Sequence, residues 1–294
     1  MAAGPQARQA GLVRGRVGVV GLGLIGGSFA KAFHAAGIEV YAANRTASTV
    51  ELALVETIDG ELDDAHVGTC ELLVLTCYPK ACVEWLESHA DAIADGAIVI
   101  DASGTKREVC SACFPLAEGR GWTFVGAHPM AGTQYSGFGH ARANMFHAAP
   151  LVLCPPPNMD DIERADVLER LKALLAPCGF GSFSVATPED HDRLIAYTSQ
   201  LAHVVSNAYV KSPTAQEHKG FSGGSYKDLT RVARLNPGMW TELFLENADN
   251  LSAEIGTIIS SLSDFKEAID ARDATSLEAL LAEGDRLKRE AEAR

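Results

Sequence analysis

The feature that most constrains the fold is the segment from Arg16 to Ser28, RVGVVGLGLIGGS, in which an apolar run ends in three glycines. Gly21, Gly23 and Gly26 have the GxGxxG spacing of a strand-turn-helix unit. In such a unit the glycines allow a tight turn, the approach of a pyrophosphate and close packing of the helix on its strand. Amides at the helix N-terminus then bind the phosphates. The segment therefore predicts a dinucleotide-binding turn, with contacts from Gly21, Leu22, Gly23, Leu24, Ile25 and Gly26.

The residues after the glycines complete one strand-helix-strand unit. Phe29 to Ala36 is an apolar helical stretch, Gly37 is suited to end it, and Glu39 to Ala43 has the composition of a second strand. Glycine-rich turns also arise for steric reasons alone. The complete unit favours cofactor binding over that alternative.

The second strand is followed by Asn44-Arg45-Thr46, at the position where an NAD-binding fold usually carries an acid against the ribose hydroxyls. Amide and hydroxyl groups with a positive charge suit the additional ribose phosphate of NADP. The sequence therefore predicts NADP as the cofactor, with NAD as the alternative. Arg45 as an ordinary solvated loop residue stays open as well.

Further short apolar runs alternate with helical stretches up to about residue 187 and predict an α/β domain. We expect a Rossmann-type, doubly wound, mostly parallel sheet over residues 15–187, after a loose N-terminus at 1–14. Ligands of such sheets lie beyond the carboxyl ends of the strands. Ser103 and His128 follow two of the runs, so they are expected at the same edge.

The chain from 188 to 294 contains helical signals and no strand pattern. Thr187-Pro188 and Asn236-Pro237 have the form of a helix cap followed by a first helical residue, and Thr275 with Glu278 has the form of a capping box. A helical domain of this size often completes its core by pairing with a second copy. We therefore expect an all-helical C-terminal dimerisation domain and a homodimer.

Composition narrows the range of partners and compartments. The formal charge of −13 argues against nucleic acid or an anionic membrane surface as a partner, and no apolar run is long enough to span a bilayer. The seven cysteines do not form a disulfide pattern, and the pair Cys110 and Cys113 lacks a second pair of metal ligands. We expect a cytoplasmic protein that binds a small molecule and no metal.

Several motifs, in order, resemble those of the prephenate and arogenate dehydrogenases of tyrosine biosynthesis. The resemblance covers nearly the whole chain, and HPMAG together with KDLTRVA is its most restrictive part. The motifs are GLGLIGGS at Gly21 to Ser28, HPMAG at His128 to Gly132, His191-Asp192, and YKDLTRVA at Tyr226 to Ala233 followed by Met239-Trp240.

Two positions depart from the pattern of this family. Gln134 stands where an acid commonly follows HPMAG, and Gln200 replaces the first histidine of a Ser-His-x-Pro-His pattern that ends here at His203. The first departure removes a charge from the expected entrance of the substrate site, which the resemblance places at Thr133 and Gln134.

The resemblance implies oxidative decarboxylation of a cyclohexadienol, either prephenate or arogenate, with a nicotinamide cofactor. It makes His128 the candidate proton acceptor, with Ser103 bonded to the substrate hydroxyl or to His128 and also near the cofactor. Arg231 is the candidate for binding a carboxylate, and Asp228, one turn earlier, is the candidate for orienting it. Further substrate contacts are expected from His203, Ser199 and Trp240, whereas His191 is assigned a structural role.

Structural alternatives remain for most of these residues. They are a turn-stabilising role for His128, a helix cap for Ser103, a surface ion pair for Arg231, and core positions for His203 and Trp240. Two other functions also remain open. One is another NADP-dependent hydroxyacid or imine reductase, and the other is a non-enzymatic NADP-sensing module.

Overall fold

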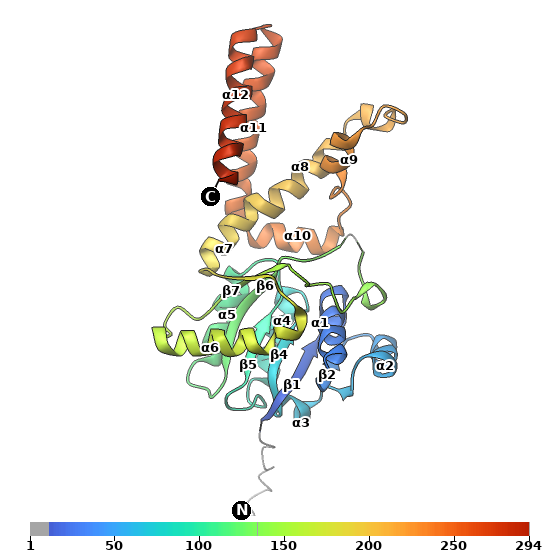
Figure 1. Cartoon of the computed structure of the whole chain (residues 1–294), viewed down its shortest axis with the longest axis vertical. Coiled ribbons are helices and arrows are strands. Elements are labelled where there is room, and N and C mark those ends of the chain that lie inside the picture. Colours follow the sequence, from blue (N-terminus) through green and yellow to red (C-terminus); the bar gives the residue numbers. More distant parts are fainter. Residues whose placement is uncertain (1–11, 134, 294) are drawn as a thin grey trace, which may run out of the picture.

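The computed structural model describes residues 12–133 and 135–293, which form a sheet-containing domain and a helical domain (Figure 1). Most of the expected loose N-terminus, residues 1–11, lies outside the described residues. The first strand begins at Val13, so residues 13 and 14 belong to the sheet rather than to the preceding segment.

The sheet has eight strands in the order β3-β2-β1-β4-β5-β6-β7-β8. Every neighbouring pair is parallel except β6 and β7, which confirms the mostly parallel sheet that the alternating pattern predicts. The strands are β1 (Val13–Val20), β2 (Val40–Ala43), β3 (Gly60–Glu61), β4 (Cys70–Leu75), β5 (Ile98–Asp101), β6 (Thr123–Pro129), β7 (Pro150–Cys154) and β8 (Ser182–Val185).

Helices cover both faces of this sheet because the central strands are apolar on both sides. In β4, Leu72 and Val74 belong to one buried cluster, whereas Leu73 and Leu75 belong to the other. The first cluster includes side chains of α1 (Leu24–Ala35), α2 (Ala47–Glu56) and α6 (Asp161–Leu174). The second includes side chains of α3 (Asp64–Val67), α4 (Pro79–His89) and α5 (Arg107–Ala117). The result is the doubly wound Rossmann-type arrangement expected from the sequence.

The turn between β1 and α1 requires glycine at two positions for different reasons. Gly21 has a φ of +95°, a conformation that other residues rarely adopt. A Cβ on Gly26 would lie 1.9 Å from the Gly21 carbonyl oxygen and 2.2 Å from the Thr76 hydroxyl oxygen, so the helix could not pack where it does. Gly23 has open space around the position of a Cβ. Only Gly23 is therefore free of a packing requirement.

The described residues after 187 are helical and contain no strand. They begin with α7 (Pro188–Ile195), a π-helical segment η3 (Ala196–Leu201) and α8 (Ala202–Tyr209). They continue with α9 (Gly224–Thr230), α10 (Pro237–Glu246), α11 (Ala248–Asp270) and α12 (Ala274–Glu292). Short 3₁₀ turns lie at Phe138–His140 (η1), Ala176–Cys178 (η2) and Pro213–Gln216 (η4).

Local signals predict two of the helix starts correctly and one wrongly. The side chain of Thr187 accepts a hydrogen bond from the Asp190 amide, and that of Asn236 accepts one from the Met239 amide, as their cap positions predict. The capping box at Thr275 and Glu278 is wrong, because Asp273 caps α12. The Asp273 carboxylate accepts from the amides of residues 275 and 276, so the cap and the start of the helix lie two positions earlier than predicted.

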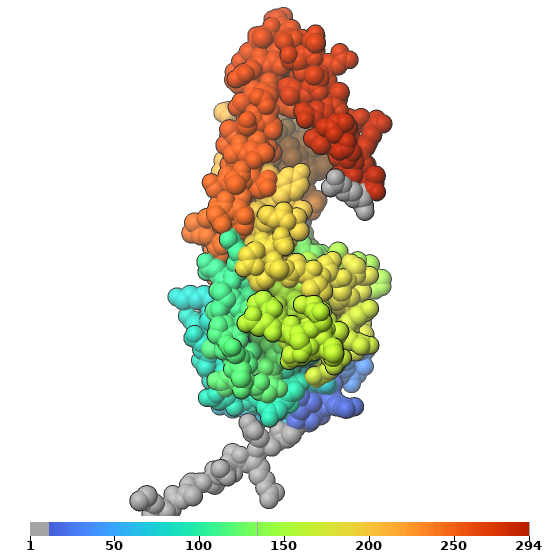
Figure 2. Space-filling model, turned by 90° about the vertical axis from the view of Figure 1, so that its left-hand side faces the viewer, coloured from blue at the N-terminus to red at the C-terminus, as the bar shows by residue number. Residues whose placement is uncertain are grey.

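The two domains meet where α7 packs on α5. The carboxylate of Asp192, on α7, accepts hydrogen bonds from the amides of Lys106 at 2.7 Å and Arg107 at 2.9 Å and so caps the N-terminus of α5. The Arg107 guanidinium forms an ion pair with Asp249 on α11. Above this junction α11 and α12 rise as a hairpin away from the sheet domain (Figures 1 and 2).

A second contact between the domains involves α10, which lies over the carboxyl edge of the sheet (Figure 1). The Thr105 hydroxyl, in the turn between β5 and α5, donates to the carboxylate of Glu246 at the end of α10. Burial raises the pKa of Glu246 to about 7, and the nearby acids Glu242, Glu108 and Asp192 add to this effect. This carboxyl group therefore ionises near neutral pH.

We predict that Gly26→Ala destabilises the nucleotide-binding domain, because the added methyl group collides with backbone. The cost expected from overpacking is about 1–3 kcal/mol, measured as a lower midpoint of denaturant unfolding. Gly23→Ala is the matched control, since it adds the same methyl group to open space. Equal midpoints for the two variants would show that the helix does not need this close approach.

We also predict a pH-dependent stability effect at Glu246. The folded protein has a raised pKa at this carboxyl and binds its proton more tightly than the unfolded chain, so stability is lost as the pH rises from about 4.5 to about 7. Glu246→Gln cannot ionise and should raise the melting temperature more at pH ~8 than at pH ~5. Glu278→Gln on the exposed face of α12 serves as the charge control, and an equal effect of Glu246→Gln at both pH values would contradict the account.

Candidate functional site

Ser103 and His128 lie next to each other at the carboxyl edge of the sheet. Ile100 of β5 pairs with Val125 of β6, and the two candidates each lie three residues beyond that pair. Ser103 follows the end of β5, whereas His128 is still within β6 and opposite Val152 of β7. The strand register therefore places Ser103 and His128 at the carboxyl edge of the sheet, as the order of the apolar runs predicts.

A buried carboxylate fixes both positions. Asp101 accepts hydrogen bonds from the Ser103 amide and the Ala127 amide, each at 2.9 Å, and from the ammonium group of Lys106. Both Asp101 and Lys106 are fully buried. Burial alone would lower the pKa of Lys106, but the neighbouring Asp101 raises it, so Lys106 stays protonated. The backbone of Ser103 and that of Ala127, the residue before His128, are therefore bonded to the same carboxylate.

The hydroxyl oxygen of Ser103 is buried and has no hydrogen-bond partner among the described residues. Ser103 itself is 6% exposed. Buried hydroxyl groups are normally bonded, so an orphaned one beside a candidate base indicates a position for a ligand. This observation fits the expected contact of Ser103 with substrate or cofactor.

His128 contacts the helical domain through His191, which in turn contacts Asp192. Its Nδ1 lies 2.9 Å from Nε2 of His191, and Nδ1 of His191 lies 2.7 Å from a carboxylate oxygen of Asp192. Burial lowers the pKa of His128 well below its usual value, and the neighbouring His191 and Lys106 lower it further. His128 is therefore neutral near physiological pH, as a proton acceptor must be.

His191 is the residue whose position the sequence interpretation missed. The sequence assigned it a structural role near a helix start, yet it contacts the ring of His128 from 63 positions away. It is 2% exposed, and burial lowers its pKa although the hydrogen bond to Asp192 acts in the opposite direction. The only signal in the sequence was the His-Asp motif of the resembling family.

The predicted cofactor residues surround the turn before α1. Gly23 is the N-cap of α1 and no side chain caps this helix, so the amides of its first turn (residues 24–26) are available to phosphate oxygens. The side-chain oxygen of Asn44 accepts a hydrogen bond from the Leu22 amide at 2.9 Å. Arg45 and Thr46 are exposed beside it. The site therefore has room for a pyrophosphate at Gly23 and carries a positive charge after β2.

Two of the predicted substrate residues come together in the helical domain. The ring centroids of His203 and Trp240 lie 4.1 Å apart with the ring planes tilted by 30°, and Nδ1 of His203 lies 2.8 Å from the carbonyl oxygen of Ser199. Gln200, which departs from the family pattern, is buried and bonds to α10 and to Asn247, the residue after α10. Its amide donates to the Leu243 carbonyl and its oxygen accepts from Asn247. This departure therefore has a structural role.

Three further predicted substrate residues, Thr133, Asp228 and Arg231, are exposed. Arg231 follows the end of α9, and the structure contains no ion pair between it and Asp228 among the described residues. Thr133 is exposed after β6, and Gln134 lies outside the described residues. The structure therefore places Arg231 and Thr133 at the surface without joining them to His128.

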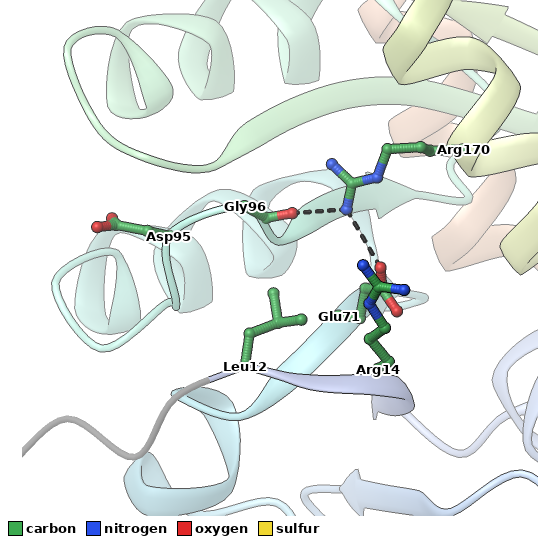
Figure 3. A pocket seen from close by; sticks show the side chains of 6 residues that line it. All are labelled: Leu12, Arg14, Glu71, Asp95, Gly96 and Arg170. Atoms are coloured by element: carbon green, nitrogen blue, oxygen red, sulfur yellow. Dashed lines mark hydrogen bonds and ion pairs between the residues drawn. The ribbon is translucent and has the colours of Figure 1, made fainter.

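The described residues offer neither a metal site nor a membrane-spanning helix. Cys110 and Cys113 are buried in α5, and the described residues contain no cluster of metal-ligand side chains. None of their helices is long and apolar enough to cross a membrane. A pocket of about 420 Å³ lies at the opposite end of the sheet, where Arg170 bonds to the Gly96 carbonyl and to Glu71 (Figure 3).

Two family models match this chain. The nucleotide-binding domain of prephenate dehydrogenase matches residues 29–180, and the dimerisation domain of prephenate dehydrogenase matches residues 187–283. Together they cover both domains of the structure. They select one of the function classes that the sequence left open.

Individual relatives agree with the family models. The prephenate dehydrogenase of Lactococcus lactis subsp. cremoris is 28% identical over 279 residues, which are 92% of this chain and 75% of that protein. The structure of prephenate dehydrogenase from A. aeolicus in complex with hydroxyphenyl propionate and NAD+ is 27% identical, with a TM-score of 0.80, 95% of this chain covered and 99% of that chain. Synechocystis arogenate dehydrogenase is 28% identical, with a TM-score of 0.76 and coverage of 93% and 99%.

The order of the domains, the glycine turn and the neutral histidine at the same edge of the sheet, and these matches agree with one another. The chain belongs to the prephenate dehydrogenase family and is an oxidoreductase that uses a nicotinamide cofactor.

Proposed function

We propose that this chain catalyses the oxidative decarboxylation of prephenate or arogenate. The observation that carries the proposal is the neutral His128 near the orphaned Ser103 hydroxyl, at the edge of the sheet where the glycine turn also lies. The bound nicotinamide would accept a hydride from the hydroxyl-bearing ring carbon. The opposite ring carbon would lose its carboxylate as carbon dioxide, and formation of the aromatic ring would drive the reaction.

In this proposal His128 takes the proton of the substrate hydroxyl. An imidazole in this role needs a free nitrogen and a pKa that leaves it neutral, and burial provides the second condition. Ser103 would donate to or accept from the same hydroxyl, which satisfies its orphaned oxygen. The Asp101 carboxylate accepts from the amides of Ser103 and Ala127, so it fixes the backbone at Ser103 and just before His128.

Binding of the substrate carboxylates falls to the helical domain. Arg231 would bind one carboxylate with its planar guanidinium, with Asp228 on the preceding turn of α9. The rings of His203 and Trp240 pack against each other at a tilt of 30° and would contact the substrate ring, with Ser199, Thr133 and Gln134 as further contacts. A chain with a net charge of −13 needs such local positive charge to bind an anion.

The preferred cofactor is proposed to be NADP. Asn44 already uses its side-chain oxygen to accept from the Leu22 amide, so no carboxylate is offered to a ribose hydroxyl there. Arg45 is exposed next to it and could pair with the ribose phosphate.

The functional unit is proposed to be a homodimer formed by the residues after about Pro188. The matched dimerisation domain supports this, as do large apolar side chains that α11 and α12 leave exposed in the single chain. These side chains are Ile259, Leu262, Ile269, Leu281 and Leu287.

The roles of His128 and Arg231 predict opposite kinetic signatures with whichever of the two substrates is turned over. His128→Asn should lower kcat by about 10²- to 10⁴-fold with KM little changed, because the base acts in the transition state. Arg231→Gln should chiefly raise KM, with a loss of about 2–5 kcal/mol in kcat/KM, because the carboxylate is bound in the ground state. His34→Asn and Arg193→Gln, both exposed, are the matched controls. Unimpaired turnover in the first variant, or unchanged KM in the second, would show that the roles are assigned to the wrong residues.

The cofactor proposal predicts a higher kcat/KM with NADP than with NAD. Arg45→Ala should lower the NADP value by about 10- to 100-fold, the usual worth of a hydrogen bond between charged groups, and leave the NAD value nearly unchanged. Asn44→Asp should shift the preference toward NAD. Arg120→Ala, which removes an arginine paired with Asp91, controls for loss of charge. An NAD preference in the unmodified chain that persists in Arg45→Ala would refute NADP as the preferred cofactor.

The assembly proposal predicts that light scattering of the full chain gives twice the chain mass of 31.2 kDa. Replacing Leu262 and Ile269 together by Glu should shift this mass toward that of one chain, because it buries charge in the expected interface. A stable single chain at micromolar concentration without any substitution would contradict the homodimer.

A further inference from the structure

The hydrogen bonds around His128 determine which of its ring nitrogens carries a proton. Several hydrogen bonds lower the pKa of Asp192 despite its burial, so this residue is a carboxylate and only accepts. The hydrogen between it and Nδ1 of His191 therefore belongs to the histidine. Neutral His191 then has an unprotonated Nε2, which can only accept.

The same reasoning extends to His128. Because Nε2 of His191 accepts, Nδ1 of His128 must donate across the 2.9 Å that separates the two atoms. Neutral His128 has one ring hydrogen, which this contact uses. Its Nε2 is left with a free lone pair, the form that a general base requires.

The charges that face this pair come from three elements. Lys106 lies on the α5 side, Asp101 ends β5, and Asp192 lies on α7. Burial and the charge of Lys106 disfavour a proton on either histidine, whereas Asp192 favours a proton on Nδ1 of His191. Burial and the surrounding charges thus keep both histidines neutral and determine which ring nitrogen of His191 carries its hydrogen.

Asp192 itself is held rigidly. Its two oxygens accept from the Lys106 and Arg107 amides at the start of α5, and its carbonyl oxygen accepts from the buried side chain of Asn247. A side chain with these bonds cannot rotate away from His191 without leaving several buried donors unpaired. The orientation of His191 is therefore set by the junction between the domains.

We propose that His191 and Asp192, on the first helix of the helical domain, are positioning residues that hold His128 with Nδ1 protonated and Nε2 free. The proposal rests on the proposed function only in that Nε2 of His128 receives the hydroxyl proton. It makes α7 part of the proton-accepting apparatus, although the base itself lies on the sheet. Nothing in it requires a proton to pass from His128 to His191.

Two substitutions at His191 separate positioning from other roles. Glutamine is long enough to place an amide oxygen near the position of Nε2 and accept from His128, whereas asparagine reaches Asp192 but not His128. We expect His191→Asn to lower kcat by about 10²-fold or more with little change in KM. His191→Gln should recover most of this loss. A Gln variant as impaired as the Asn variant, with equal melting temperatures, would overturn positioning in favour of proton transfer through His191.

A spectroscopic measurement tests the same claim without turnover. In the full chain with ¹⁵N-labelled histidine, the His128 signals, assigned by their loss in His128→Asn, should show a protonated Nδ1 and an unprotonated Nε2 near neutral pH. His191→Asn should produce a mixture of the two tautomers. A protonated Nε2 in the unmodified protein would overturn the inference even if a variant fails to fold. If the protein turns over neither prephenate nor arogenate, the proposed function fails while this spectrum still decides the inference.

Discussion

The structure depends on the carboxylate of Asp192 more than on any other single group. It caps the N-terminus of α5, which follows the Ser103 loop, and it also fixes His191 against His128. One buried group thereby joins the helical domain to the sheet and orients the candidate base. Such a group is costly to bury unless all its hydrogen bonds are made, and here backbone amides and a histidine make them.

The sheet provides the second half of this arrangement through Asp101. Its carboxylate joins the ends of β5 and β6 by accepting from the Ser103 and Ala127 amides, and Lys106 neutralises it in the interior. Both carboxylates accept from Lys106, Asp101 from its ammonium group and Asp192 from its amide. The glycine turn depends on backbone geometry at Gly21 and close packing at Gly26, together with hydrogen bonds with the neutral side chains of Asn44 and Thr76.

Features that depend on neighbouring residues could be predicted from the sequence. The glycine spacing, the alternation of strands and helices, and the caps at Thr187 and Asn236 are local, and the structure contains each of them. The contact of His191 with His128 joins residues 63 positions apart, and no local pattern signals it. The cap of α12 was missed because Asp273 competes with Thr275 for the same position, and the carboxylate accepts from two amides at once. The role of Gln200 depends on Asn247 and Leu243, which the sequence does not place beside it.

The central claim is that this edge of the sheet couples oxidation of a cyclohexadienol to loss of its ring carboxylate. The most direct test is the ratio of carbon dioxide released to nicotinamide cofactor reduced, measured with prephenate and with arogenate. The account predicts equimolar amounts with at least one of the two substrates. Reduction of the cofactor without carbon dioxide, or binding of both substrates without any reduction, would contradict it.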